Sequence, residues 1–217
     1  MSVRIGIVAD IHDAVEPLER ALSLLRERGV DRIVTLGDAF ETFEPGDPGP
    51  KVGALLQGAG AVGVWGNHDF GLSDGASEEV RRQADAGLVE FASRLEPRLV
   101  IEGCHFCHIE PWKDPRSLVD LWLFEEYPDT LERARRSFDA VPERILFVGH
   151  FHSSLVVRED GRVEWDGARP IRLSEPHRHL VLVPAVLRGW CATYDTDISE
   201  LALIRCAAPQ TGSVEAG

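Results

Sequence analysis

Cysteine is scarce in this sequence, with four residues in a chain of 217. So few cysteines do not form the dense disulfide framework of a small secreted protein. No apolar stretch approaches the roughly 18 residues that a membrane helix requires, so we expect no association with a membrane. The opening residues, MSVRIGIVADIHD, lack the basic segment and the long apolar core of a signal peptide, and Asp10 interrupts their hydrophobic run. We therefore expect a cytoplasmic protein with reduced cysteines.

Basic residues are also few relative to acidic ones. There are 23 Lys and Arg against 36 Asp and Glu, which gives a formal net charge of -13. Non-specific binding to nucleic acid requires clustered positive charge, so we expect none. An acidic chain is compatible with metal sites, because carboxylates and imidazoles hold divalent cations. The hydrophobic fraction of 44% and the charged fraction of 27% are typical of a globular protein with a substantial core.

Hydrophobic periodicity predicts strands and helices that alternate along the first two thirds of the chain. Strands are expected at 3–9, 32–36, 61–65, 98–101, 104–109 and 144–148, and helices at 17–28, 51–57, 77–95 and 118–138, the last broken by Pro128. The segment 40–50 is expected to be a loop, and short strands follow as far as Cys206. This order predicts one α/β domain over residues 1–206, with a flexible tail at 207–217.

The run CHFCH, residues 104–108, admits three interpretations. C-x-x-C-H is the haem-attachment signature, and C-x-x-C alone is typical of a redox pair or half of a zinc site. Covalent haem attachment normally follows export, and no export signal is visible. In the third interpretation one histidine of the run is functional and the cysteines are incidental. Alternation along the predicted strand puts His108 on one face and both His105 and Cys107 on the other.

Each of five predicted strands ends in a small cluster of acidic or metal-competent side chains. The clusters are Asp10-Ile11-His12, Gly37-Asp38, Gly66-Asn67-His68-Asp69, His108 and Gly149-His150-Phe151-His152. Taken singly, each has an ordinary explanation as a helix cap, a turn or a surface histidine. Ligands of layered α/β proteins bind beyond the carboxyl ends of the strands, so the five together predict a common cleft.

The ordered set of motifs resembles that of the calcineurin-like metallophosphoesterases. That family shows D-x-H, then G-D, then G-N-H-D/E, then an isolated H, then G-H-x-H. This sequence has ADIHD, LGDAF, WGNHDF, FCHIEP and VGHFH in the same order. The resemblance covers residues 1–155 strongly and later strands only in general pattern. It implies an α-β-β-α sandwich of two packed mixed β-sheets flanked by helices.

The resemblance also implies a two-metal centre. By its motifs, Asp10, His12 and His152 bind the first metal, Asn67, His108 and His150 bind the second, and Asp38 bridges them. The expected cofactors are two divalent transition-metal ions from the group Mn, Fe, Zn, Co and Ni, which suit imidazole combined with carboxylate. Two such ions about 3.5–4 Å apart clamp a phosphate and activate a water. In this interpretation the C-x-x-C spacing beside His108 is a coincidence.

The same resemblance predicts two catalytic residues. His68 stands near the leaving-group oxygen and assists its departure, and Asp69 orients or charge-stabilises the His68 imidazole. The implied activity is that of a dimetal phosphoesterase, which hydrolyses a phosphate mono- or diester of a small metabolite or nucleotide through attack of a metal-bound hydroxide. The alternative is a non-catalytic scaffold of the same fold that binds protein partners. That alternative predicts decayed ligand positions or loss of His68, and neither is seen.

Three departures from the family pattern concern substrate preference. Ala-Phe-Glu follows Gly37-Asp38, without the Arg-Gly pair of the protein serine/threonine phosphatases, which argues against that activity. Ile-Glu-Pro follows His108, where compact bacterial-type members often have His-Gly. Val-Pro-Ala-Val at 183–186 replaces an Asn-Pro-Gly-Ser stretch. None of the three removes a predicted ligand.

Several further residues have open roles. Trp112 and Trp122 belong either to the core or to a wall of the expected cleft. His177 and His179 are interpreted as part of a solvated loop, with contact to a substrate phosphate as the alternative. No feature of the sequence specifies an oligomeric state.

Overall fold

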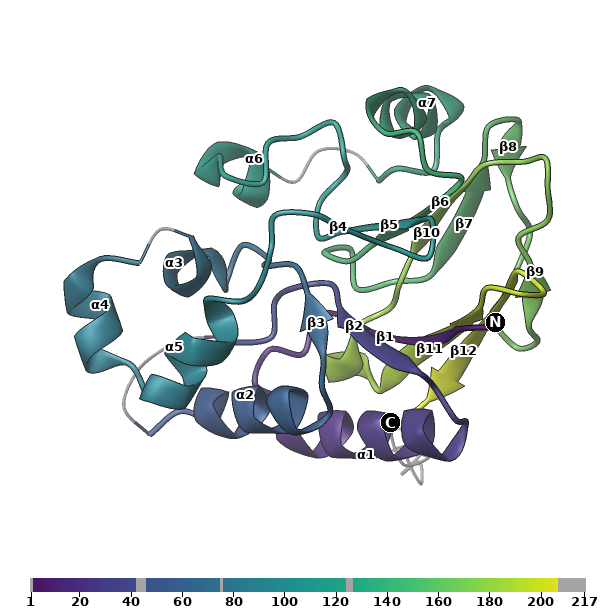
Figure 1. Ribbon diagram of the computed structural model, residues 1–217. Helices are drawn as coiled ribbons and strands as arrows, with labels where there is room; N and C mark the ends of the chain where they lie inside the picture. Colours follow the sequence, from purple (N-terminus) through teal and green to yellow (C-terminus); the bar gives the residue numbers. More distant parts are fainter. Residues whose placement is uncertain (1, 42–45, 75, 124–126, 207–217) are drawn as a thin grey trace, which may run out of the picture.

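Two mixed β-sheets pack face to face in the structure, a computed structural model that describes residues 2–41, 46–74, 76–123 and 127–206 (Figure 1). Within these residues the first sheet has the order β3 (Val62–Gly63), β2 (Arg32–Thr35), β1 (Arg4–Val8), β11 (Trp190–Asp195), β12 (Glu200–Arg205), β9 (Ile171–Arg172). The second has the order β4 (Leu99–Ile101), β5 (Cys104–Cys107), β6 (Ile145–Val148), β10 (His179–Leu182), β7 (Leu155–Arg158), β8 (Gly161–Arg162).

Helices cover both outer faces of this pair of sheets. They are α1 (Val15–Glu27), α2 (Gly49–Gly58), α3 (Phe70–Ser73), α4 (Glu78–Gln83), α5 (Ala86–Ala92), α6 (Leu118–Trp122) and α7 (Leu131–Ala140), with a 3₁₀ turn η1 (Val186–Arg188). Figure 1 shows α1 and α2 along one face and α7 along the opposite face. The predicted α-β-β-α sandwich is therefore confirmed.

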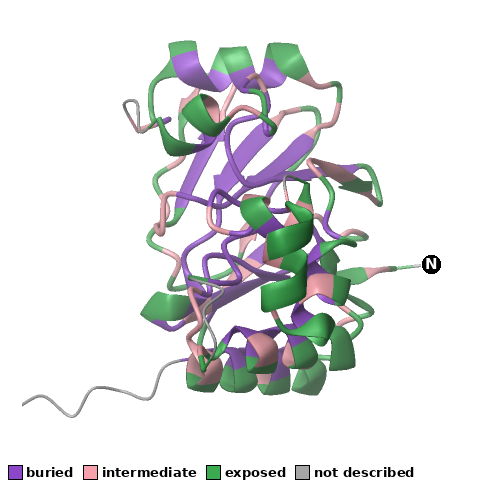
Figure 2. Ribbon diagram, turned by 90° about the vertical axis from the view of Figure 1, so that its left-hand side faces the viewer, coloured by how far each residue is buried: buried purple, intermediate pink, exposed green. Residues whose placement is uncertain are grey.

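Strand alternation divides the apolar side chains among three layers. Between the sheets, Ile5 and Ile7 of β1 meet Phe106 and Phe147, whose rings stack with centroids 5.2 Å apart. The other faces of the strands pack against α1, α2 and α5 on one side and against α7 on the other. Figure 2 shows the result, with buried strands between helices whose outer faces are exposed.

Parallel strands in both sheets set the position of the site. β1, β2 and β3 run parallel, as do β5, β6 and β10. The carboxyl ends of each set therefore lie at one edge of their sheet. This is the arrangement in which α/β proteins bind ligands.

Two predicted helices are each divided. The helix expected at 77–95 is broken into α4 and α5, because Asp85 caps a new helix by accepting from the backbone amides of Gly87 and Leu88. The helix expected at 118–138 is divided into α6 and α7, each with its own N-cap, Ser117 and Thr130. The short helix α3 was not predicted.

Other expectations concern the ends and loops. The predicted loop at 40–50 includes residues 42–45, which lie outside the described residues, and α2 begins within it at Gly49. The expected tail at 207–217 also lies outside them. The single domain over 1–206 stays a prediction. None of the helices in the described part of the chain combines the length and the hydrophobicity that crossing a bilayer requires.

Candidate metal centre

Hydrogen bonds tie together the loops that follow the parallel strands. After β1 and β2, the amide of Asp10 donates to the carbonyl of Gly37 (3.1 Å), and the amide of His12 donates to the carbonyl of Asp38 (3.0 Å). The amide of His150, after β6 of the other sheet, donates to Asp10 Oδ1 (3.0 Å). The strand ends of the two sheets therefore meet at one place.

The backbone at this place is left-handed at many of the predicted ligands. The φ angles are 50° at Asp10, 46° at His12, 49° at Asp38, 67° at His150 and 53° at His152. This conformation costs an L-residue about 1–2 kcal/mol, although Asp tolerates it better than most. Strained residues gather at functional sites, where the surrounding structure holds them. The five loop residues are therefore held in place at a cost in stability, which indicates a function for their side chains.

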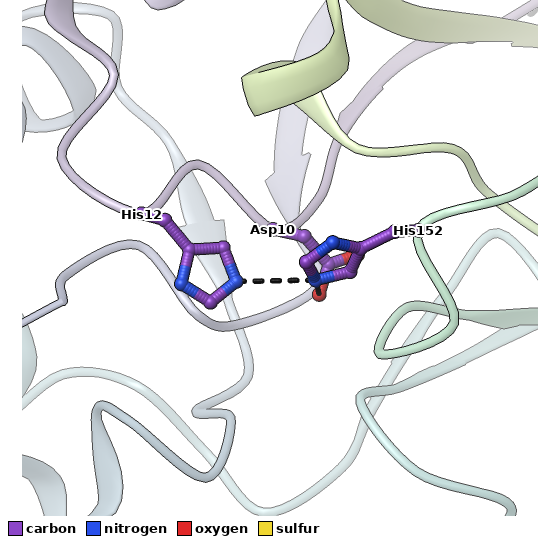
Figure 3. Close-up of side chains that lie close together, drawn as sticks. All are labelled: Asp10, His12 and His152. Atoms are coloured by element: carbon purple, nitrogen blue, oxygen red, sulfur yellow. Dashed lines mark hydrogen bonds and ion pairs between the residues drawn. The ribbon is translucent and has the colours of Figure 1, made fainter.

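A first group of ligand atoms is formed by Asp10, His12 and His152 (Figure 3). The two imidazoles face each other, with His12 Nε2 3.1 Å from His152 Nε2. His152 Nε2 lies 3.6 Å from Asp10 Oδ1. The Asp10 carboxylate is fully buried, and its Oδ2 has no hydrogen-bond partner among the described residues. A buried carboxylate oxygen without a partner is costly unless a cation satisfies it.

A second group surrounds His108. His108 Nε2 lies 3.0 Å from Asn67 Oδ1, 3.1 Å from His150 Nδ1 and 3.3 Å from Asp38 Oδ2. On the other side of the ring, Nδ1 donates to the carbonyl of Leu36 (2.7 Å). That bond keeps a proton on Nδ1, so Nε2 is the nitrogen that a metal would bind after displacing its proton.

Asp38 reaches both groups. Its Oδ2 is 3.3 Å from His108 Nε2 and 3.7 Å from His12 Nε2. Its Oδ1 accepts from the backbone amide of His68 (2.9 Å). Gly66 makes this position possible, because a Cβ there would lie 2.1 Å from Asp38 Oδ1. The carboxylate therefore has the position that a bridging ligand needs.

The acids of the cluster have pKa values shifted in opposite directions. Burial raises the pKa of Asp10 to about 8, against the opposing effect of the His108 charge. Burial also acts to raise the pKa of Asp38, but the charge and the hydrogen bond of His108 outweigh it and hold that pKa well below its usual range. Of the two carboxyl groups, that of Asp38 is therefore the ionised one at neutral pH.

The histidines of the cluster also have pKa values shifted in opposite directions. Burial lowers the pKa of His150 to about 3, helped by the neighbouring His108 charge, and lowers that of His152 to about 4, helped by His12. Burial also acts to lower the pKa of His108, but the Asp38 carboxylate raises it to about 9. His150 and His152 are therefore neutral at neutral pH, which is the protonation state that a metal ligand needs.

These residues fit a metal. Acceptor atoms of Asn67, His150 and Asp38 converge on His108 Nε2 at hydrogen-bond distances, and a second convergence lies between His12 and His152. Facing acceptors repel one another unless a proton or a cation stands between them. Imidazole and carboxylate donors suit a divalent transition metal. The structure thus contains a candidate His/Asp metal site.

The predicted catalytic residue His68 stands beside this site. Its ring centroid is 4.8 Å from that of His12, and it forms a further group of close ligand atoms with His12 and Asp38. Its Nδ1 is 3.3 Å from the carbonyl oxygen of Glu41, and the ring lies against Trp122. The imidazole is partly exposed, unlike the buried His108 and His150.

Asp69 makes its described hydrogen bonds with backbone amides. Its Oδ1 accepts from the amides of Ala39 (3.0 Å) and Phe40 (3.1 Å), and its Oδ2 accepts from the amide of Gly66 (3.0 Å). None of its described contacts is with the His68 imidazole. Burial and the Asp38 charge raise its pKa to about 6. The carboxylate therefore joins the loop after Asp38 to the loop before His68.

Glu41 was not singled out from the sequence. Its Oε2 lies 2.6 Å from His12 Nδ1, on the ring edge opposite the nitrogen that faces His152. A carboxylate on the second nitrogen of a ligating histidine is a common partner that fixes the ring. The sequence shows only that an acidic residue lies three positions after Asp38. It does not indicate the contact with His12, because that contact depends on how the loop folds.

The remaining histidines and cysteines lie away from the candidate site. His177 pairs with Glu159 (3.2 Å). The interpretation of His179 as part of a solvated loop was wrong, because it is buried at the start of β10, opposite the carboxyl end. Burial raises the pKa of both Cys104 and Cys107 to about 12, so both are neutral thiols. Among the described residues, no group of close metal-binding atoms includes a cysteine. The metal-site interpretation of C-x-x-C therefore has no support.

Comparisons with known proteins agree with this geometry. The family model of the calcineurin-like phosphoesterase superfamily domain matches residues 3–168. An uncharacterized protein of Methanocaldococcus jannaschii is 24% identical over 193 residues, which cover 82% of this chain and 73% of the relative.

Solved structures show the same fold. A metallophosphoesterase from Sphaerobacter thermophilus superimposes with a TM-score of 0.72 at 24% identity and covers 94% of this chain and 88% of its own. A hypothetical protein from Pyrococcus horikoshii gives 0.63 at 14% identity, with coverage of 96% and 89%. A structure described as a novel archaeal phosphodiesterase gives 0.54 at 15% identity, with coverage of 94% and 99%.

Proposed function

This chain belongs to the calcineurin-like phosphoesterase superfamily, and on that premise we propose that it is a hydrolase of phosphate mono- or diesters with a two-metal centre. The observation that carries the proposal is the position of Asp38 Oδ2, 3.3 Å from a nitrogen of one ligand group and 3.7 Å from a nitrogen of the other. A single carboxylate oxygen between two sets of donors is what a shared ligand requires.

We assign Asp10, His12 and His152 to one metal, Asn67, His108 and His150 to the other, and Asp38 to both. Two divalent ions from the group Mn, Fe, Zn, Co and Ni match these donors. When bound, such a pair supplies Lewis acidity to the phosphate and lowers the pKa of water. The positive charge also explains how an acidic chain attracts an anionic substrate.

His68 is the proposed proton donor to the leaving oxygen. Its Nδ1 faces the carbonyl oxygen of Glu41 at 3.3 Å, an acceptor that keeps a proton on that nitrogen. The proton given to the leaving oxygen is then the one on Nε2 of the doubly protonated ring, which becomes neutral as it donates. Because His68 is partly exposed beside His12, it has access to a group bound at the metal ligands.

Asp69 has a positioning role in this proposal. Its four described hydrogen bonds hold the backbone of Ala39, Phe40 and Gly66, next to the bridging Asp38. It thereby places Asp38 and the His68 backbone, and its influence on the His68 imidazole is exerted through that backbone. The substrate class is a small phosphorylated metabolite or nucleotide, and the expected compartment is the cytoplasm.

Reconstituted protein tests the proposal directly. The metal-free chain is loaded in turn with each of the five metals and assayed with p-nitrophenyl phosphate and with bis-p-nitrophenyl phosphate. Asp38→Asn should abolish hydrolysis, whereas Asp160→Asn, which removes only an exposed ion pair with Arg158, should not. Bound metal without hydrolysis of either ester would favour the alternative, a scaffold that binds protein partners.

A further inference from the structure

The helix α6 carries exposed apolar side chains next to the candidate site. Leu118 is 57% exposed, Val119 69%, Trp122 49% and Leu123 43%, while Leu121 is fully buried. Single exposed apolar residues are normal, but a contiguous group marks a binding surface. Figure 1 shows α6 on the same side of the molecule as α3, which follows the His68 loop.

Trp122 connects this surface to the site. Its ring centroid lies 5.0 Å from that of His68, with the planes inclined at 54°. The His68 centroid lies in turn 4.8 Å from that of His12, a proposed metal ligand. A group bound at the metal ligands and long enough to pass His68 would therefore reach the indole.

Hydrogen bonds hold α6 in this position. Ser117 caps the helix by accepting from the amide of Asp120 (3.2 Å), and the Asp120 carboxylate accepts from the amide of Asp114 (2.9 Å). At the other end, Lys113 Nζ donates to the carbonyl of Leu123 (3.1 Å). The helix is therefore fixed at both ends, so the exposure of Trp122 is a built feature.

A buried ion cluster supports the same segment. Glu110 is 1% exposed and lies 3.1 Å from Lys113 and 2.8 Å from Arg133 of α7. Breaking such a buried pair is strongly destabilising, so the cluster ties α6 firmly to the second sheet and its helix. Trp112, the other tryptophan of this segment, faces the Arg136 guanidinium with its ring at 3.5 Å. Trp122, in contrast, lies against the His68 ring and is half exposed.

We propose that Trp122 determines substrate specificity by stacking on an aromatic base carried by the leaving group, so that the substrate class is a nucleotide. The inference rests on the proposed phosphoesterase function. Two ring-to-ring steps, of 5.0 and 4.8 Å, separate the indole from the His12 ring. These two steps are comparable in length to the span of a sugar between a phosphate and its base. An exposed indole buries most apolar surface when a flat aromatic ring stacks on its face. Such stacking depends little on which base is bound, because every base has an aromatic face.

The test compares two phosphates that differ only in the base, adenosine 5′-monophosphate and ribose 5-phosphate. The metal-loaded wild type should prefer the nucleotide in kcat/KM, and Trp122→Ala should reduce that preference roughly 10- to 100-fold, mainly through KM. Trp122→Phe should retain most of the preference, because it keeps an aromatic face. Val119→Ala is the matched control, since it truncates another exposed side chain of α6, and it should leave the preference at the wild-type value.

Calorimetric titration of the same two compounds reads binding separately from hydrolysis. Equal affinity of the wild type for both, or an equal loss of affinity for both in Trp122→Ala, would overturn the stacking inference. If the wild type binds the nucleotide through Trp122 but hydrolyses neither compound, the proposed function fails and the base-stacking surface stands.

Discussion

Replacing Asp69 with asparagine separates the two roles considered for this carboxylate. In the structure its oxygens accept from the amides of Ala39 (3.0 Å), Phe40 (3.1 Å) and Gly66 (3.0 Å), all buried. Asparagine has one acceptor oxygen, so its NH₂ group must face at least one of these N–H donors. The substitution therefore leaves a buried donor without an acceptor and removes the charge from the other bonds.

The size of the effect follows from these bonds. A hydrogen bond to a charged acceptor contributes about 1.5–3 kcal/mol, and a buried unsatisfied donor costs about 1–3 kcal/mol, so we expect Asp69→Asn to lower the free energy of unfolding by about 3–5 kcal/mol. For a chain of this size that lowers Tm by about 6–20 °C. Because Asp38 is in the same loop, metal affinity should fall about 10- to 100-fold, as for other residues that orient ligands.

Urea and thermal unfolding of the metal-free protein, with calorimetric metal titration, measure both effects. Asp85→Asn is the control, because Asp85 also accepts from two amides but at an exposed N-cap, where asparagine serves equally well. Suppose that Asp69→Asn matches this control in stability and metal affinity while kcat falls. The carboxylate would then act on His68, as the sequence suggested, and the positioning role would be refuted.

Three further results are expected. Replacing Cys104 and Cys107 together with serine should leave the metal content unchanged, whereas His108→Ala should abolish or weaken metal binding by the second group. Loss of metal from the cysteine variant would contradict the assignment. His68→Ala should lower kcat/KM by about 100-fold or more at unchanged metal content, and equal loss of both would make His68 structural. Burial lowers the pKa of His179 to about 4, with the Arg144 charge adding to the effect, so the folded state keeps this ring neutral. Between pH about 6.5 and 4 the unfolded chain binds a proton that the folded chain does not, so stability present above pH about 6.5 is lost on acidification, by up to about 3 kcal/mol. His179→Leu should flatten that part of the stability profile in urea unfolding, and an unchanged slope would contradict the argument.

The strand ends were predictable because each shows two features in the sequence, an apolar run and a polar residue shortly after it. An apolar run such as Ile5-Gly6-Ile7-Val8 is followed by Asp10, a proposed ligand, and parallel strands bring such ends to one edge. The sandwich itself was implied by the resemblance of the five ordered motifs to those of the family. The bond between His108 Nδ1 and the Leu36 carbonyl, 72 residues apart, has no sequence signal, because it depends on how the sheets face each other.

Other features depend on local competition or on the folded loops. The helix expected at 77–95 had apolar residues at helical spacing, but the side chain of Asp85 competes for the backbone amides and begins a new helix. The partners of Asp69 are backbone amides, which all sequences share. Likewise the sequence could not distinguish Trp112, covered by Arg136, from Trp122, half exposed beside His68.

Anomalous diffraction from crystals of the manganese- or zinc-loaded protein, recorded at the metal absorption edge, tests the two-metal centre most directly. We expect two peaks per chain, with Asp38 between them. One should contact Asp10, His12 and His152, and the other should contact Asn67, His108 and His150. A single peak, or a peak at Cys104 and Cys107, would contradict this expectation.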